Sequence, residues 1–421
     1  MKGEYVFTQI CRFLPKEEFN WFIKKYDGNK SVKAFKCWNQ LLALIFGQLA
    51  GCESLRVLVS SLQAHKSKLY HLGIGTNLSI SNFSYANQNR DSRIFEDLAT
   101  LMIKTARNKR ISAVDEFFIK EGNVYAFDST TISLCLSRFD WTRLHHDMGG
   151  IKIHLLYDVK TDVPADYTIT SADLHDSKEM DKISFESGSY YIYDRGYMDT
   201  EMLYLIHKTG GYFVVREKVN QTYVIVEDHQ YINQTTGIMR DQRIRFTGYK
   251  TSRQYPEVLR RVEYYAKEEN LFFVFYTNNL TVSPEDVALL YKYRWKVELF
   301  FKWIKQHLHV KQFYGYNENA VRIQIHVAII TYCLIAIIEH DLGVKMDTYY
   351  MLRILSVSLL DKTPIRDLLL QADQEIDKQN DSSQLIKESR IPSPIQISTI
   401  VSVLRPNVPN TPILSIDQPQ N

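Results

Sequence analysis

Apolar residues in the first quarter of the chain recur at helical spacing. Phe7, Ile10 and Leu14 lie three or four positions apart, Pro15 interrupts the pattern, and residues 38–49 form a strongly apolar run. Such spacing places side chains on one face of an α-helix, and proline is poorly tolerated inside one. Residues 1–115 are therefore predicted to form an all-helical N-terminal domain.

From about residue 121 the pattern changes to short runs of β-branched and aromatic residues. Strands are predicted over residues 123–136, 151–159, 165–170, 190–194 and 211–215, with helices over 177–183 and 200–208. Strands alone are predicted next, over residues 223–226, 244–249, 262–266 and 271–276. The order predicts an α/β domain with a mixed sheet over residues 116–345, carrying a β-rich insertion at about 217–280.

The predicted sheet is followed by helices. Ser283, Pro284 and Glu285 are the cap, first-position proline and first-turn acid of a helix that is expected to run to about residue 309. Residues 327–338 are almost wholly apolar, but they are too few to span a bilayer, so a buried helix is expected. A helical segment is predicted over residues 346–390. Residues 391–421 hold six of the 11 prolines, which predicts an extended or disordered tail.

Composition and charge exclude some classes of protein. The 421 residues include 51 Lys and Arg and 48 Asp and Glu, so a formal charge of +3 excludes a polycation such as a histone. The five cysteines are scattered without metal-finger spacing, which is typical of a reduced, intracellular protein. No signal peptide is evident. We therefore expect a soluble cytoplasmic protein with no membrane partner.

A lysine-rich stretch lies in the predicted helical domain. Residues 21–38 hold five lysines and one acid, Asp27, and the polar residues Asn82, Asn87, Asn89, Arg90 and Arg93 follow. A run of lysines is also what a solvated surface shows. The stretch is therefore open to two interpretations, a solvated face or a DNA-contacting module.

Two aspartates follow apolar strand segments. Asp128 comes after Val124-Tyr-Ala-Phe127, and Asp194 comes after Tyr190-Tyr-Ile-Tyr193. A carboxylate at such a position is costly to bury unless it is paired or binds a cation. A single such residue is more often a turn or a helix cap, but two on neighbouring strands favour a metal site.

The third acid is Glu298. At about 100° per residue, Tyr291, Arg294, Glu298 and Lys305 share one narrow stripe of the predicted helix. An adjacent stripe is apolar and consists of Leu290, Val297, Phe301, Ile304 and Leu308. Residues 291–312 contain six Lys or Arg and this one acid. A solvated helix normally mixes its charges, so the pattern suits a metal ligand among phosphate-binding groups.

Phosphodiester cleavage is a reaction that requires carboxylates, cations and aromatic residues of this kind. It needs an activated water and a neutralised anionic transition state, which two Mg²⁺ or Mn²⁺ ions provide together. Such ions prefer oxygen ligands, as the carboxylates of Asp128, Asp194 and Glu298 offer. Arg and Lys hold phosphates, and Tyr291 or Trp295 is suited to stacking on an unpaired base. Arg195 is a further candidate DNA contact, although a turn explains it nearly as well.

These motifs resemble a known family, the DDE transposases of the bacterial insertion-sequence-4 group. Its Y-(2)-R-(3)-E-(6)-K signature matches Tyr291, Arg294, Glu298 and Lys305 without a gap. The two aspartate motifs correspond to AFDSTTI around Asp128 and YDRGY at residues 193–197. The segments GGIKIHLLYD and FYTNN also fit, and the first 110 residues resemble a helical module found in a subset of these proteins.

The resemblance implies a ribonuclease H-like catalytic fold interrupted by a β insertion. It implies an enzyme that binds the inverted-repeat ends of its element as a dimer on double-stranded DNA. That enzyme cleaves the ends with two Mg²⁺ or Mn²⁺ ions held by Asp128, Asp194 and Glu298, and joins the 3′-OH to target DNA. Tyr291, Arg294, Lys305, Trp295 and Arg195 are the expected DNA contacts.

Three alternatives stay open at this point. A metal-dependent nuclease of the same fold cuts without joining, and an inactive domesticated relic binds DNA only. Retention of all three acids argues against the relic. A glycosidase also uses paired carboxylates, but it leaves the basic cluster around Glu298 without a role.

Overall fold

The structure is a computed structural model, and it describes residues 3–75, 78–111, 118–119, 121–134, 149–172, 183–229, 236–307, 313–344, 346 and 348–373. In its N-terminal part the described residues are helical, in agreement with the prediction. The described residues before β1 form helices without a strand: α1 (Val6–Cys11), α2 (Lys16–Lys25), α3 (Cys37–Leu49), α4 (Leu55–Ala64), η1 (Lys66–Lys68), α5 (Ile80–Asn89) and α6 (Arg93–Ile111). Local sequence explains several boundaries. Pro15 separates α1 from α2, and the Ser54 hydroxyl caps α4 by accepting from the Val57 amide at 3.2 Å.

A nine-stranded mixed sheet forms the centre of the molecule. Its strands are β1 (Val124–Leu134), β2 (Gly149–Asp158), β3 (Val163–Ser171), β4 (Tyr190–Tyr193), β5 (Tyr212–Arg216), β6 (Tyr223–His229), β7 (Ile238–Phe246), β8 (Leu259–Ala266) and β9 (Leu271–Thr277). The spatial order is β3-β2-β1-β4-β5-β9-β8-β7-β6. β1, β4 and β5 pair in parallel, and the other pairs are antiparallel. The predicted α/β class with a mixed sheet is confirmed.

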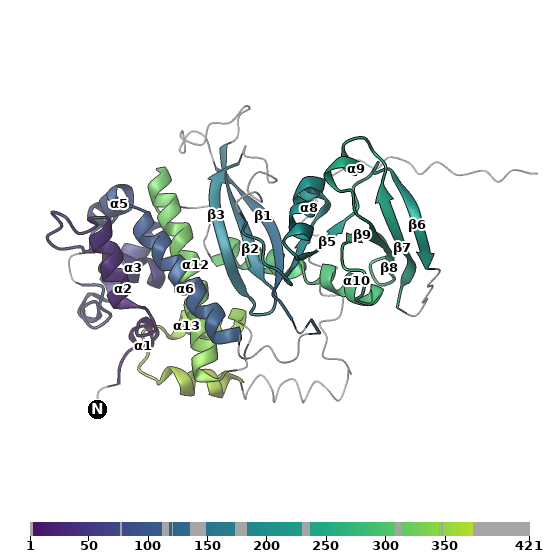
Figure 1. The fold of residues 1–421 in the computed structure, drawn as a ribbon. Coiled ribbons are helices and arrows are strands. Elements are labelled where there is room, and N and C mark those ends of the chain that lie inside the picture. The colour runs from purple at the N-terminus through teal and green to yellow at the C-terminus, as the bar shows by residue number, and fades with distance from the viewer. Residues whose placement is uncertain are drawn as a thin grey trace, which may run out of the picture.

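The β-rich segment expected as an insertion extends this same sheet. β9 pairs with β5, and β8, β7 and β6 follow outward. Figure 1 shows β5 to β9 on one side of β1, with the N-terminal helices on the other side, beyond β3. Two further helices lie in this half, α8 (Thr200–Lys208) and the short α9 (Thr251–Gln254).

Side chains on the central strands alternate between two cores. On β1, Tyr125 and Phe127 pack in the core that includes α8, whereas Val124 and Ala126 pack in the larger core. The larger core includes residues of α10 (Pro284–Lys292), α11 (Trp295–His307) and α12 (Glu318–Leu342). Since alternation has a period of two, Asp128 shares the face of Val124 and Ala126 and points toward α10 and α11.

The apolar helix α12 is buried. All residues from Val327 to Ile338 are buried, and α12 contacts α3, α5 and α6 as well as β3. By length and composition it is long enough to cross a membrane, but 94% of its apolar window is buried inside the protein. The prediction of a buried core helix here is confirmed. The chain continues into α13 (Thr348–Ser358), and residues 365–373 are also helical.

β1 agrees with the strand expected over residues 123–136: it continues past Asp128 to Leu134, so only the apolar run ends before Asp128 and the residue itself lies within the strand. Two details differ from the sequence-based expectations. The helix expected from Ser283 to about residue 309 is broken at Tyr293 and Arg294, which separate α10 from α11. β7 begins earlier than expected, because its polar residues are paired inside the sheet. The expected helix at 177–183 and the tail at 391–421 lie outside the described residues, except for Ile183, which is not helical.

Candidate active site

The parallel pairing of β1 with β4 brings two aspartates together. Ala126 lies opposite Ile192, and each strand has its aspartate two positions further on, Asp128 and Asp194. Asp194 directly follows β4 and precedes the short helix η3 (Arg195–Tyr197). Both carboxylates therefore lie on the same face and at the same level of the sheet.

Asp128 is mostly buried, with 18% of its side chain exposed. Its Oδ1 accepts from the Ser129 amide at 2.8 Å and from the Tyr197 hydroxyl at 3.3 Å, and its Oδ2 accepts from Arg294 Nη1 at 3.2 Å. Burial raises the pKa of Asp128 to about 6; Glu298 and Asp194 also raise it, and Arg294 opposes the shift. The positive charge of Arg294 thus favours the ionised form of Asp128, against the effect of burial.

Glu298 lies in the first turn of α11 and faces the same position. Its Oε1 is 2.6 Å from Arg294 Nη2, and 32% of its side chain is exposed. The guanidinium of Arg294 therefore bridges Asp128 and Glu298. The Arg294 Nε is buried and has no hydrogen-bond partner within the described part of the chain. A single cation thus lies between two of the three acids.

Tyr291 holds the third acid. Its hydroxyl donates to Asp194 Oδ1 at 2.9 Å, and its ring packs on Phe275 with centroids 4.6 Å apart. Burial raises the pKa of Tyr291 well above its usual value, so the hydroxyl stays protonated and remains a donor. The last turn of α10 and the end of β4 are thereby joined.

The break between α10 and α11 changes how the four signature residues meet. Arg294 N donates to Tyr291 O at 3.1 Å and Val297 N to Arg294 O at 3.2 Å, so the backbone tightens into three-residue turns here. Tyr291 and Glu298 are therefore not on one stripe of an unbroken helix, as expected from the sequence. They still converge, because Tyr291 donates to Asp194 and Arg294 pairs with both Asp128 and Glu298. The apolar stripe at Leu290, Val297, Phe301 and Ile304 is buried as expected, and Leu308 lies outside the described residues.

The remaining predicted site residues lie around this centre. Lys305 is exposed on α11; partial burial of its ammonium group lowers its pKa, and the charge of Asp128 opposes that shift. Trp295 is partly exposed beside Arg294, whose guanidinium lies 5.8 Å from the indole centroid. Arg195 is exposed and has no ion-pair partner among the residues that the structure describes. All three are open to a ligand that approaches the acids.

Sequence reasoning missed the part played by Tyr197 and Ser129. The hydroxyl of Tyr197 donates to Ser129 Oγ at 2.8 Å as well as to Asp128, and its ring packs edge-on against Phe127 at 5.1 Å. Tyr197 is 5% exposed, so its role is to pack and to orient Asp128. Tyr197 follows Asp194 by three residues, and the short 3₁₀ helix between them directs its side chain toward β1. This spacing is the feature of the sequence that could have indicated its role.

The residue types at this site suit a divalent cation, whereas their arrangement in the structure is one around Arg294. Asp128, Asp194 and Glu298 offer carboxylate oxygens, which Mg²⁺ and Mn²⁺ prefer, and buried carboxylates need a compensating positive charge. In the described residues, no three His, Cys, Asp or Glu side chains are arranged closely enough to hold one ion. Arg294 supplies the positive charge between Asp128 and Glu298. The site is thus arranged around a guanidinium.

Comparison with known proteins places this site in a family. The family described as "Transposase DDE domain" matches residues 119–334, half of the chain and all three acids. Residues 2–75 match a domain of unknown function. Among solved structures, a piggyBac transposase synaptic complex with hairpin DNA is similar at a TM-score of 0.40 and 11% identity, covering 98% of this chain and 88% of that chain.

Curated relatives carry names of the same kind. A putative transposase of Sinorhizobium fredii is 33% identical over 50% of this chain and 59% of its own length. A probable insertion-sequence transposase of Geobacillus stearothermophilus is 30% identical over 49% and 54%, and one of Synechocystis is 26% identical over 69% and 81%. The chain thus spans somewhat more than half of the first two relatives. With the DDE domain matched over half of its residues, the chain belongs to the transposase DDE domain family.

Proposed function

We propose that this protein is a DNA transposase. It binds the inverted-repeat ends of an insertion sequence, cleaves DNA at these ends by two-metal phosphodiester hydrolysis, and joins the freed 3′-OH to target DNA. The observation that carries the proposal is the convergence of Asp128, Asp194 and Glu298, from two adjacent strands and one helix, around the side chains of Arg294 and Tyr291.

The catalytic roles follow from chemistry and position. DDE domains depend on divalent metal ions in general. We assign Asp128, Asp194 and Glu298 as the residues that would hold two Mg²⁺ or Mn²⁺ ions. When bound, such ions make a water nucleophilic near neutral pH and neutralise the anionic transition state.

The surrounding residues act on the DNA. Arg294 and Lys305 hold phosphate oxygens, which a guanidinium and an ammonium bind by charge-assisted hydrogen bonds. Tyr291 orients Asp194 through its hydroxyl. Trp295 offers a partly exposed ring on which an unpaired end base stacks, and Arg195 contacts the backbone beside Asp194.

Finer points of classification belong to the same proposal. We assign the chain to the insertion-sequence-4 group from its Y-R-E-K signature, and we assign residues 116–345 to a ribonuclease H-like fold, which the mixed pairing of β1 to β5 supports. Residues 1–115 form the DNA-binding module. The active species is a homodimer on paired ends in the bacterial cytoplasm, associated with the nucleoid.

Cleavage and joining of the element's own ends test the proposal. Purified full-length protein, Mg²⁺ and a labelled duplex carrying the terminal repeat are combined with supercoiled target DNA. We expect cut and joined products from wild type and from Glu268→Ala, an exposed acid in the turn between β8 and β9. Asp128→Ala, Asp194→Ala and Glu298→Ala are expected to give neither product.

Each other outcome is informative. If any of the three acid variants cuts like wild type, its assignment as a metal ligand is wrong. Cut ends that are never joined identify a metal-dependent nuclease of the same fold. If wild type neither cuts nor joins but still binds the ends, the chain is a domesticated DNA-binding protein.

A further inference from the structure

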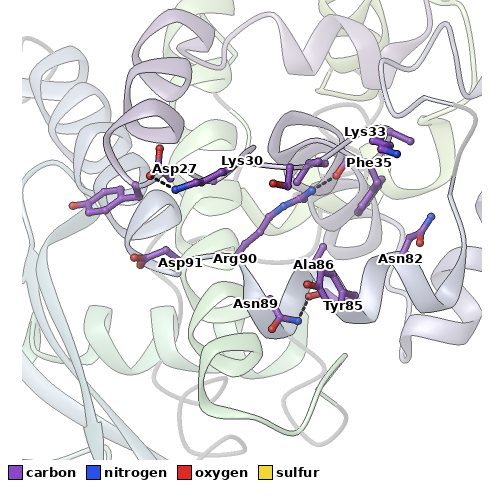
Figure 2. Close-up of a pocket in the computed structure, with 15 residues that line it drawn as sticks. Asp27, Lys30, Lys33, Phe35, Asn82, Tyr85, Ala86, Asn89, Arg90 and Asp91 are labelled. Atoms are coloured by element: carbon purple, nitrogen blue, oxygen red, sulfur yellow. Dashed lines mark hydrogen bonds and ion pairs between the residues drawn. The ribbon is translucent and has the colours of Figure 1, made fainter.

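A cleft lies in the helical part of the chain, well away from the three acids. It has a volume of about 550 Å³ and runs between the loop that follows α2 and one face of α5 (Figure 2). Its walls carry the cations Lys30, Lys33 and Arg90 and the polar side chains Asn82 and Asn89. The lysine-rich stretch and the asparagines that stood out in the sequence therefore face one another across one cleft.

The loop that forms one wall is held in place by specific contacts. Asp27 and Ser31 adopt positive φ angles of 54° and 57°. The Cys37 amide donates to Asn29 Oδ1 at 2.9 Å, and the rings of Phe35 and Phe83 pack with centroids 5.2 Å apart. Non-glycine residues in the left-handed region persist where the surroundings determine them, so the cleft is a built feature of the fold.

Arg90 is a buried cation at the base of the cleft. It is 7% exposed, and its guanidinium donates to Gln40 Oε1 at 2.7 Å. It also donates to the Phe35 carbonyl (Figure 2). Both acceptors are neutral, and no carboxylate pairs with Arg90 among the residues that the structure describes. Burial lowers the pKa of Arg90, which reflects the cost of this charge. A buried charge with only neutral partners is stabilised when an anion enters the cleft.

The other charges leave the cleft positive. Lys33 is exposed without an ion-pair partner in the described part of the chain, and Lys30 lies 3.7 Å from Asp27 with both side chains about three-quarters exposed. A pair this exposed contributes little and is easily exchanged. The second acid of the cleft, Asp91, is already paired with Arg93 at 2.6 Å. An anion therefore meets three cations here.

The opposite wall is suited to contacts with bases. Asn82, Tyr85 and Asn89 lie within about 60° of one another around α5, and all three are exposed. Tyr85 is 70% exposed, so its ring is accessible to a ligand at this wall. Asparagine amides recognise adenine edges, and an exposed ring packs on sugars or bases.

One residue grouped with these in the sequence has a different role. Asn87 is 2% exposed, and its Oδ1 accepts from Gln40 Nε2 at 2.7 Å. Gln40 in turn accepts from Arg90, so Asn87 orients Arg90 from behind. Asn87 is therefore a structural residue and not a DNA contact.

We propose that this cleft binds the phosphate backbone of duplex DNA. Lys30 and Lys33 hold phosphates, the buried Arg90 adds positive charge at the base of the cleft, and Asn82 and Asn89 contact base edges in the adjoining groove. The inference rests on the proposed function for its ligand, DNA, and it names the residues by which the helical part holds an element's end.

Salt-dependent binding tests the cleft separately from catalysis. Fluorescence anisotropy of the full chain with a labelled duplex carrying the terminal repeat is measured over a range of NaCl concentrations. Each phosphate contact contributes about 0.9 to the slope of log affinity against log salt. Lys30→Ala/Lys33→Ala is expected to reduce that slope by roughly 1.8 and to weaken binding at least tenfold near 0.1 M salt. Both lysines are exposed, so the variant is expected to fold.

Matched variants separate the parts of the proposal. Lys267→Ala, an exposed lysine between β8 and β9, is expected to keep the wild-type slope. Asn82→Ala/Asn89→Ala is expected to keep the slope but to reduce the preference for the terminal repeat over a scrambled duplex. At constant ionic strength, inorganic phosphate in place of chloride is expected not to displace the duplex.

Two results overturn the inference. One is a Lys30→Ala/Lys33→Ala variant with the affinity and salt slope of wild type. The other is displacement of the duplex by millimolar phosphate, which assigns the cleft to a small anion. Either result leaves the transposase proposal standing if cleavage still requires the three acids. Wild type that binds no duplex at all refutes both.

Discussion

The hydroxyl of Tyr291 donates a hydrogen bond to the carboxylate of Asp194, across 2.9 Å and 97 positions of sequence. It is the contact by which the last turn of α10 is fixed to the end of β4. Arg294 and Glu298 follow directly after that turn. The contact therefore links the helical side of the site directly to an acid at the centre of the sheet.

Removing this hydroxyl is expected to impair cleavage with little effect on folding. Tyr291→Phe keeps the ring packed against Phe275 but leaves Asp194 without its donor. Loss of a group that orients a metal ligand typically reduces activity or metal affinity about 10–100-fold. Cleavage rates as a function of Mg²⁺ concentration, together with a thermal melt, measure both effects. A wild-type rate at all Mg²⁺ concentrations would show that the hydrogen bond has no functional role.

Replacing Arg294 is expected to make stability depend on divalent ions. Arg294→Gln removes the cation between Asp128 and Glu298, so the free energy of unfolding falls by about 1.5–3 kcal/mol, the size of hydrogen bonds to charged groups. Mg²⁺ restores the missing charge. The rise in melting temperature on adding Mg²⁺ should therefore be larger for Arg294→Gln than for wild type.

Arg294→Lys is the matched control for that experiment. It keeps a positive charge but lacks the fork that bridges two carboxylates, so its response to Mg²⁺ should lie between those of wild type and Arg294→Gln. Equal responses for all three proteins, or removal of bound Mg²⁺ by EDTA without any change in melting temperature, would contradict the arrangement described here.

A close backbone approach beneath β1 and β4 gives a stability prediction. Gly122 has a φ of +69°, and a Cβ there would lie 2.0 Å from the carbonyl oxygen of Gly188. Gly188 also has a positive φ, +76°, but a Cβ there would meet nothing within 4 Å. Gly188→Ala is thus expected to cost about 1–2 kcal/mol, and Gly122→Ala clearly more, because it adds a backbone clash. Urea denaturation of both variants tests that order, which equal costs would refute.

The acid stability of the protein should depend on His326. This residue of α12 is buried, its Nδ1 is hydrogen-bonded to the Tyr167 hydroxyl at 2.6 Å, and burial, followed by the charge of Arg322, lowers its pKa to about 3. Between the unfolded pKa near 6.5 and about 3, only the unfolded chain binds this proton. The free energy of unfolding therefore falls with decreasing pH, by up to about 1.4 kcal/mol per pH unit.

His326→Gln should remove that contribution. Denaturation at several pH values between 4 and 6.5 is expected to give a shallower pH dependence for the variant, by roughly one proton. His71→Gln, at an exposed histidine, serves as the control and should follow wild type. An unchanged dependence in His326→Gln would mean that another buried group determines the acid limit.

Much of the local structure could be predicted from the sequence because the local signals agree with the fold. Ser283 caps the expected helix, its Oγ accepting from the Asp286 amide at 3.0 Å. Ser54 caps α4 within the expected helical domain. The candidate acids could also be identified from the sequence, because a carboxylate next to an apolar strand segment is costly to bury without a partner. The assignment of Asp128, Asp194 and Glu298 as catalytic stays a prediction, for the experiments above.

Tertiary contacts explain what could not be predicted. β7 was expected to begin at Ile244, because its first half is polar. In the structure, Asp241 accepts two hydrogen bonds from Arg260 of β8 at 2.7 Å, and Gln242 accepts one from Arg261 at 3.1 Å. A strand whose polar residues are paired with a neighbour has no apolar alternation to reveal it. The break at Arg294 could not be predicted either, because the periodicity of the sequence continues through it and one ion-pair partner of Arg294, Asp128, lies on a distant strand.

The burial of α12 has an evolutionary consequence. One side of this helix packs on α3, α5 and α6, and it also contacts β3, so the N-terminal helices and the sheet share one hydrophobic core. A fragment that began after α6 would present an uncovered apolar surface to water and would aggregate. An exchange of the proposed end-binding helices alone would break up this shared core. We therefore expect a change in the proposed DNA specificity to arise by substitution at exposed positions such as Asn82 and Asn89, within a core that is inherited as a unit.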